Sequence, residues 1–219
     1  MENQIKEIAG SWLVMIGTIT YAIGSTPSPV LSEETLEDLV IIGNVLQAMG
    51  NVLEAEGQGD FTLETLGNEL QATGNVTVIA GLLLPLDEED EQKTVIAGTW
   101  LQVLGGLVAL SDEFYDTTDA DDSYNIYGNL LQAIGNSLQA KSLMASLIEE
   151  LCENETESEQ SNNDSATPLF LTGVWIQAIG SVIALIGQTK EETEELRRKQ
   201  VYPGSRLGYT AWSESYTYY

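Results

Sequence analysis

The sequence predicts an all-α protein from six copies of one motif, a seven-residue spacing of glycines, and charges confined between the copies. The motif reads roughly G-x-[WL]-L-Q-A-x-G-[NS]-x-L and begins at Gly10, Gly43, Gly67, Gly98, Gly128 and Gly173. A second glycine follows seven residues later in every copy, at Gly17, Gly50, Gly74, Gly105, Gly135 and Gly180. Repetition of one unit along the chain indicates an array of a single supersecondary element.

Each copy has the composition and period of an α-helix. Seven residues make about two helical turns, and the Leu, Gln, Ala and Met between the glycines favour helix. With Gly43 as the first position of a heptad, the third and fourth positions are Val45 and Leu46, and the second and fifth are Asn44 and Gln47. On a helical wheel the apolar positions form one face and the amides a narrow stripe opposite, flanked by glycine and alanine. Because no period of two indicates strands, we expect six helices in antiparallel hairpins.

The first three helices have recognisable boundaries. The first lies in an uncharged segment and ends before Thr26-Pro27-Ser28-Pro29. The second begins at Ser32-Glu33-Glu34 and the third at Thr62-Leu63-Glu64, where a hydroxyl residue precedes acids in the first turn. An acidic connection over 86–91 then leads to the fourth helix.

The last helices are separated by longer polar segments. Residues 112–122 form an acidic connection before the fifth helix, and 149–165 form a polar linker that we expect to be flexible. The sixth helix extends through residues 190–200, where both charge signs occur. We therefore expect a six-helix repeat domain over 1–200 and a separate aromatic tail over 201–219.

The twelve motif glycines have an energetic cost that predicts their role. A glycine inside a helix costs about 1 kcal/mol relative to alanine, so a dozen cost on the order of 10 kcal/mol. That is comparable to the net stability of a whole domain. Close packing of neighbouring backbones along a glycine seam would offset the cost, with the shallow left-handed crossing that a heptad favours. The alternative, that these glycines cap or break helices, fits poorly because caps occur once per helix.

The copies fall into two classes. Those with Trp12, Trp100 and Trp175 are almost wholly apolar, whereas the other three carry paired asparagines. Helices that are apolar on all sides are normally buried. We therefore expect the tryptophan-bearing helices to form the centre of the fold.

The amide stripe allows two interpretations. Its members are Asn44, Gln47, Asn51, Gln71, Asn75, Gln102, Asn129, Gln132, Asn136 and Gln177. They could be a solvated surface, or they could be buried at a helix–helix or subunit contact where amides hydrogen-bond and set the register. Because solvated stripes normally carry Lys and Glu, the absence of charge favours burial in an assembly.

Composition excludes most chemistry. The chain has 34 acidic and 8 basic residues, no histidine and a net charge of −26, so a phosphate backbone would be repelled. Without histidine the usual general base and metal ligand are missing, and Cys152 has no partner to activate it. The acidic runs 112–116 and 119–123 lack the glycine and closing glutamate of a calcium loop. We expect no catalytic residue, cofactor, metal site or nucleic-acid partner.

Membrane insertion is an alternative explanation for the uncharged segments. Residues 8–31, 94–110 and 166–189 approach the ~20 residues that span a bilayer. The many amides and a mean hydropathy of −0.04 argue against it. The first apolar segment is itself a repeat, so we expect no cleavable signal peptide and a cytoplasmic or cell-surface protein.

The aromatic tail also has two interpretations. Its candidate contact residues are Tyr202, Tyr209, Trp212 and Tyr216. It is either a loose chain end or an arm that docks on a neighbouring subunit by strand addition or aromatic anchoring.

The core G-N-x-L-Q-A-x-G-N, found at 43–51 and 128–136, resembles bacterial families of uncharacterised repetitive proteins. The resemblance implies no activity. Our leading hypothesis is a non-enzymatic structural protein that self-assembles through its uncharged Gly/Ala/Asn/Gln faces into a filament, tube or sheet. The alternatives are a membrane-associated helical bundle or pore, and a carrier that holds an apolar small molecule between the tryptophan-bearing helices.

Overall fold

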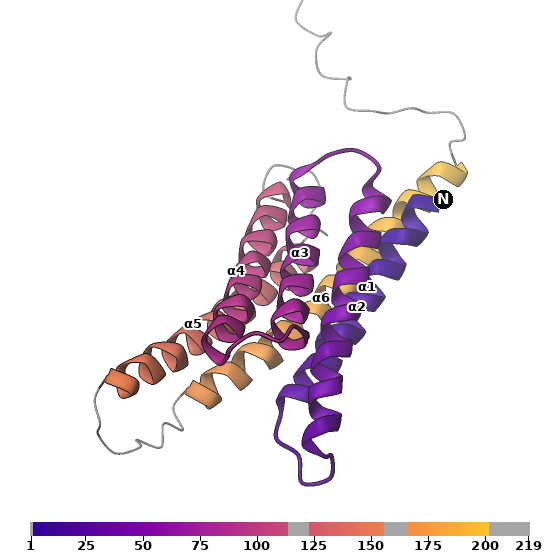
Figure 1. Ribbon diagram of the computed structural model, residues 1–219. Helices are drawn as coiled ribbons and strands as arrows, with labels where there is room; N and C mark the ends of the chain where they lie inside the picture. The colour runs from indigo at the N-terminus through magenta and orange to yellow at the C-terminus, as the bar shows by residue number, and fades with distance from the viewer. Residues whose placement is uncertain (1, 114–122, 156–165, 202–219) are drawn as a thin grey trace, which may run out of the picture.

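The computed structural model describes residues 2–113, 123–155 and 166–201, and this part of the chain contains six helices and no strand (Figure 1). The helices are α1 (Glu2–Ser25), α2 (Glu33–Gln58), α3 (Leu63–Leu83), α4 (Glu88–Glu113), α5 (Ser123–Glu155) and α6 (Ala166–Val201). The all-α prediction is confirmed, and each copy of the motif lies within one helix.

The helix starts at α2 and α3 follow from local capping. The side chain of Ser32 accepts a hydrogen bond from the backbone N–H of Thr35 at the start of α2. Thr62 and Thr65 bond each other's backbone N–H groups reciprocally at the start of α3. Such caps satisfy amide groups that have no partner inside the helix.

Two expected connections are partly helical. Residues 88–91 form the first turn of α4, where four carboxylates stabilise the positive end of the helix dipole. Residues 149–155 of the expected flexible linker continue α5, so that boundary was wrong. The remainder of that linker, 156–165, lies outside the described residues, as does most of the connection 112–122.

Consecutive helices form hairpins through contacts between glycine backbones. A Cβ atom added to Gly50 would lie 2.6 Å from the carbonyl oxygen of Gly10, closer than real Cβ atoms come to any neighbour. At all twelve motif glycines an added Cβ would lie less than 3.0 Å from an atom of the facing helix, which for Gly128 is Ala184. The glycines form the pairs Gly10–Gly50, Gly17–Gly43, Gly67–Gly105, Gly74–Gly98, Gly128–Gly180 and Gly135–Gly173. Within each hairpin the earlier glycine of one helix faces the later glycine of the other, as Gly10 faces Gly50 and Gly17 faces Gly43. The two helices of a hairpin are therefore antiparallel.

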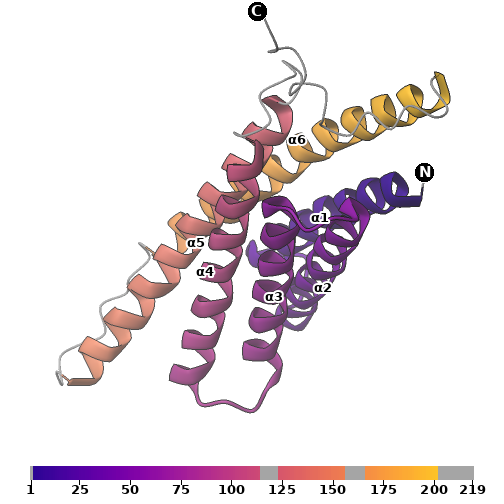
Figure 2. The same ribbon diagram turned by 90° about the horizontal axis from the view of Figure 1, so that it is seen from above.

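The three hairpins close into a ring. Besides the partners within each hairpin, α2 contacts α3, α4 contacts α5, and α6 contacts α1, so every helix has two neighbours among the described residues. Figure 2 shows that the hairpins are inclined to one another rather than parallel. The ring therefore has one interior that all six helices border.

The interior of this ring is polar and its exterior apolar. The largest fully buried side chains are Val174, Asn75, Asn136, Thr18 and Ser142, of which four are polar. The three motif tryptophans are between 41% and 49% exposed, so the expectation that their helices form the centre was wrong. The reason is steric, because the glycine side of each helix permits the closest approach and takes the interior, and the bulky face is left outside.

The glycine contacts predict different outcomes for two adjacent substitutions in α4. A Cβ on Gly105 would lie 2.5 Å from the carbonyl oxygen of Gly67, whereas one on Gly106 would make an ordinary contact of 3.6 Å with Ala133. Gly105→Ala should therefore lower the free energy of unfolding by about 1–3 kcal/mol. Gly106→Ala should leave it unchanged or raise it by up to about 1 kcal/mol.

Denaturant unfolding followed by circular dichroism measures both variants in the same solvent. Equal stability of the two variants would contradict the assignment of Gly105 to a backbone contact.

Candidate functional site

The predicted amide stripe lies inside the ring. Eight of its ten residues are buried, and Gln71 and Asn129 are half-buried. The contacts that bury them are made by other helices of the same chain. The stripe is therefore an internal feature of one molecule, although sequence alone had also allowed a contact between subunits.

Three glutamines connect three helices through the interior. The Nε2 of Gln139 in α5 donates to the Oε1 of Gln177 in α6 over 2.9 Å, and the Nε2 of Gln177 donates to the Oε1 of Gln47 in α2 over 2.9 Å. The Nε2 of Gln47 donates in turn to the carbonyl oxygen of Gly43 over 3.3 Å. In a low-dielectric interior such chains are strong, and a broken link leaves unpaired groups. This chain holds the third hairpin to the first.

Hydroxyl groups make a second contact between the first and third hairpins. The Oγ1 of Thr18 and the Oγ of Ser181 lie 2.6 Å apart, and both side chains are buried. Each hydroxyl is also within hydrogen-bond distance of a carbonyl oxygen of its own helix. The contact closes the ring between α1 and α6.

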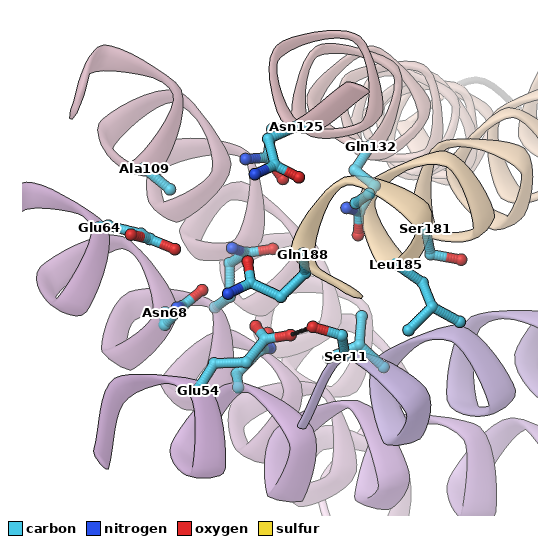
Figure 3. A pocket seen from close by; sticks show the side chains of 15 residues that line it. Ser11, Glu54, Glu64, Asn68, Ala109, Asn125, Gln132, Ser181, Leu185 and Gln188 are labelled. Atoms are coloured by element: carbon cyan, nitrogen blue, oxygen red, sulfur yellow. Dashed lines mark hydrogen bonds between the residues drawn. The ribbon is translucent and has the colours of Figure 1, made fainter. Parts of the chain in front are cut away.

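A cavity lies in the interior where all six helices contribute to its wall (Figure 3). It offers about 40 Å³ to the centres of water-sized molecules, room for about three waters. The polar wall residues are Ser11, Asn51, Glu54, Glu64, Asn68, Gln71, Asn125, Asn129, Gln132, Ser181 and Gln188. Figure 3 shows the amides of Asn68 and Gln132 directed into the space between the helices.

One carboxylate in the wall is held by a hydrogen bond across the first hairpin. The Oγ of Ser11 in α1 donates to the Oε1 of Glu54 in α2 over 2.7 Å (Figure 3). Among the described residues that line the cavity, none is Lys or Arg. The wall therefore carries only negative formal charge.

Further carboxylates lie beyond the cavity between α1 and α6. We call Glu7, Glu191, Glu192 and Glu195 the acidic end group. The Nε2 of Gln188 donates to both Glu7 and Glu192 over 3.1 Å, so this side chain links the cavity wall to the acidic end group. Asn125 and Gln4 donate to Glu191 and Glu195 over 2.9 Å. Amide donors thus partly satisfy the carboxylates.

Sequence reasoning missed many of these residues, although the heptad carries a signal for them. When the heptad numbering is continued along each helix from its motif glycine, every polar residue of the cavity wall falls at the second or fifth position. Gln139 and Thr18 occupy the same positions. The prediction took only amides near the motif centres and did not include the carboxylates at the same heptad positions.

Large apolar side chains cover the exterior. On α1, α2, α4, α5 and α6 the exposed ones include Trp12, Ile16, Val45, Met49, Val52, Trp100, Leu104, Leu107, Leu130, Ile134, Trp175, Ile179, Val182 and Ile186. The indole N–H of Trp175 donates to the Oγ1 of Thr26 over 3.1 Å, and that of Trp100 donates to the sulfur of Met144 over 3.3 Å. These polar groups on the apolar face therefore have partners within the chain.

Exposed hydroxyls on this exterior are likewise satisfied by their own helices. Thr20, Thr73 and Thr172 donate to the carbonyl oxygens four residues earlier over 2.7–2.8 Å. Such back-bonding satisfies the hydroxyl without a water molecule.

Four helices are long and apolar enough to cross a membrane. The segments are Glu2–Ser25, Glu33–Gln58, Glu88–Ser111 and Pro168–Arg197. They lie in α1, α2, α4 and α6, and all three hairpins contribute at least one.

Two further predictions concerned a site for an apolar ligand and the aromatic tail. An apolar groove of about 760 Å³ lies between α2 and α3, lined in part by Met49, Val52 and Val76. It lies beside two asparagine-bearing helices, whereas the carrier hypothesis placed its ligand between the tryptophan-bearing ones. The tail residues Tyr202, Tyr209, Trp212 and Tyr216 lie outside the described residues.

Comparison with known proteins finds one family. Residues 5–185 match the model of a family described as "Family of unknown function (DUF6944)". No curated protein and no solved structure matches the chain. The match confirms an uncharacterised family, as the resemblance implied, and brings no activity with it.

The glutamine chain predicts a non-additive mutation series. Gln177→Leu should lower the free energy of unfolding by about 2–5 kcal/mol, because it leaves groups of Gln47 and Gln139 buried and unpaired. Replacing all three glutamines with leucine should recover part of that loss, since no unpaired partner remains. Gln200→Leu, at an exposed position of the same helix, is the control and should be near neutral.

Denaturant unfolding of the single variants, the triple variant and the control provides the measurement. A triple variant less stable than Gln177→Leu by the sum of the other two losses would contradict the chain as one interacting unit.

Proposed function

Since the chain belongs to this family of unknown function, we propose from its geometry that it is a helical bundle embedded in a lipid membrane, with a polar interior. The observation that carries the proposal is the reversed distribution of side chains, with amides buried and large apolar groups exposed. A helix in a water-soluble protein turns its apolar face inward. Lipid reverses that preference.

The packing between helices supports the same environment. Lipid tails are as apolar as leucine, so helices in a membrane associate through small residues that allow close approach and through hydrogen bonds between polar side chains. Both are present, in the six glycine pairs and in the interior glutamine chain. The internally bonded exposed hydroxyls and indoles support it further.

The exposed charges on α3 and α5 fit this placement. Glu69 lies within the first two turns of α3. Lys141 is level with the start of α6, because Gly135 faces Gly173 in an antiparallel hairpin. Charged groups near the ends of a span can reach the membrane–water interface, and the long Lys side chain does so readily.

The homopolymer expected from sequence is the competing proposal. It placed the Gly/Ala/Asn/Gln faces between chains, but these faces pack within one chain. A polymer would instead have to form through the exterior apolar face. We therefore propose lipid as the main neighbour of that face and keep a polymer as an outcome of the test.

A lysine scan of two positions tests the membrane proposal. Ile179 is 55% exposed in the middle of α6, and Val30 is 88% exposed between α1 and α2. In lipid, Ile179→Lys should cost about 2.5–3.5 kcal/mol and sharply reduce the folded protein in the membrane fraction. Val30→Lys should have no effect, because the connection lies outside the bilayer.

Carbonate extraction of cell membranes, followed by quantification of the pellet, gives the readout. Wild-type protein in the supernatant would contradict the proposal, and a sedimenting polymer free of lipid would favour the homopolymer instead.

A further inference from the structure

We infer that the central cavity binds a monovalent alkali cation through amide and carboxylate oxygens. The inference goes beyond the proposed function, because it concerns binding by the purified protein and holds whether or not the bundle spans a membrane. It starts from amides that the protein itself leaves unpaired.

The side chains of three amides in the cavity wall make no hydrogen bond to another group in the described part of the chain. Asn51, Asn68 and Gln132 are only 3%, 5% and 7% exposed, and all three line the cavity. They contrast with the paired glutamines elsewhere in the interior. Their amide atoms are not among the buried unpartnered atoms but open onto the cavity, where an occupant can bond them. Three such groups from α2, α3 and α5 around one space indicate a shared occupant.

The charge of the wall selects a cation. Glu54 and Glu64 line the cavity, and Gln188 connects it to Glu7 and Glu192 of the acidic end group. Ser11 holds one oxygen of Glu54 at 2.7 Å. Whichever of these carboxyl groups is ionised attracts a cation to the wall and repels an anion. Amide and carboxylate oxygens are also the hard ligands that such ions prefer.

Size and ligand number favour an alkali ion. The space of about 40 Å³ holds about three waters, so it fits one partly hydrated ion and excludes organic ligands of drug size. In the described residues no three His, Cys, Asp or Glu side chains are grouped to hold a metal ion. A divalent ion bound mainly by carboxylates would need such a group, whereas a monovalent ion can be held largely by neutral amide oxygens.

The test is a comparison of cations at constant ionic strength. Purified full-length protein is titrated with NaCl or KCl in place of N-methyl-D-glucamine chloride, and the unfolding temperature is followed by circular dichroism. Because all solutions screen the net charge of −26 equally, a site-specific effect appears as a saturable rise with Na⁺ or K⁺. The bulky organic cation cannot enter the cavity.

Matched substitutions assign the effect to the cavity. Glu54→Gln keeps an acceptor for Ser11 but removes the ionisable carboxyl group, and should weaken cation affinity by about tenfold or more. Glu37→Gln, exposed on the same helix, should leave the affinity unchanged. Asn129→Asp adds a carboxylate to the wall and should tighten binding, so the assignment does not depend on the folding of one variant.

Saturable stabilisation by an alkali ion that is weakened by Glu54→Gln or strengthened by Asn129→Asp supports the cation site. An equal response to all three salts, or an effect that no cavity variant changes, would overturn it. Failure of the membrane proposal appears separately, in the carbonate extraction.

Discussion

Backbone contact between paired glycines is the constraint on which the rest of the structure depends. At each of the six pairs an added Cβ atom would collide with the partner helix, so only glycine permits the observed approach. The contact fixes the rotation of each helix about its axis. Since the second and fifth heptad positions flank the glycine side, their amides, hydroxyls and carboxylates turn toward the interior. The bulky third and seventh positions turn outward, and the fourth is half-buried.

The polar interior and apolar exterior therefore have one cause. Antiparallel pairing stacks equivalent heptad positions in register, which brings Gln139, Gln177 and Gln47 within hydrogen-bond distance of one another across three helices. Away from that chain the interior widens into the cavity, and the stripe changes from amides to carboxylates toward the acidic end group. The same heptad pattern thus places the glutamine hydrogen bonds, the cavity and the buried carboxyl groups inside the bundle.

The heptad sufficed to predict an all-α chain of six helices. Which face of each helix turns inward follows from the glycine contacts, and the partner helix in each contact cannot be identified from the sequence of one helix alone. The assumption of water placed Trp12, Trp100 and Trp175 at the centre, whereas the structure exposes them. The pairing of Gln188 with Glu7 joins residues 181 positions apart, so no local pattern could predict it. The role of Glu54 likewise depends on Ser11 from another helix.

The environment of the exterior apolar face is the central claim, and a spin label tests it most directly. A nitroxide on Ile179→Cys, in a Cys152→Ser background, would be studied in lipid vesicles that contain the protein. We predict that the label collides more often with oxygen, which dissolves in lipid, than with a water-soluble nickel complex. A label on Val30→Cys should show the opposite preference. If position 179 collided as often with the nickel complex as position 30, the face would lie in water and the account would be contradicted.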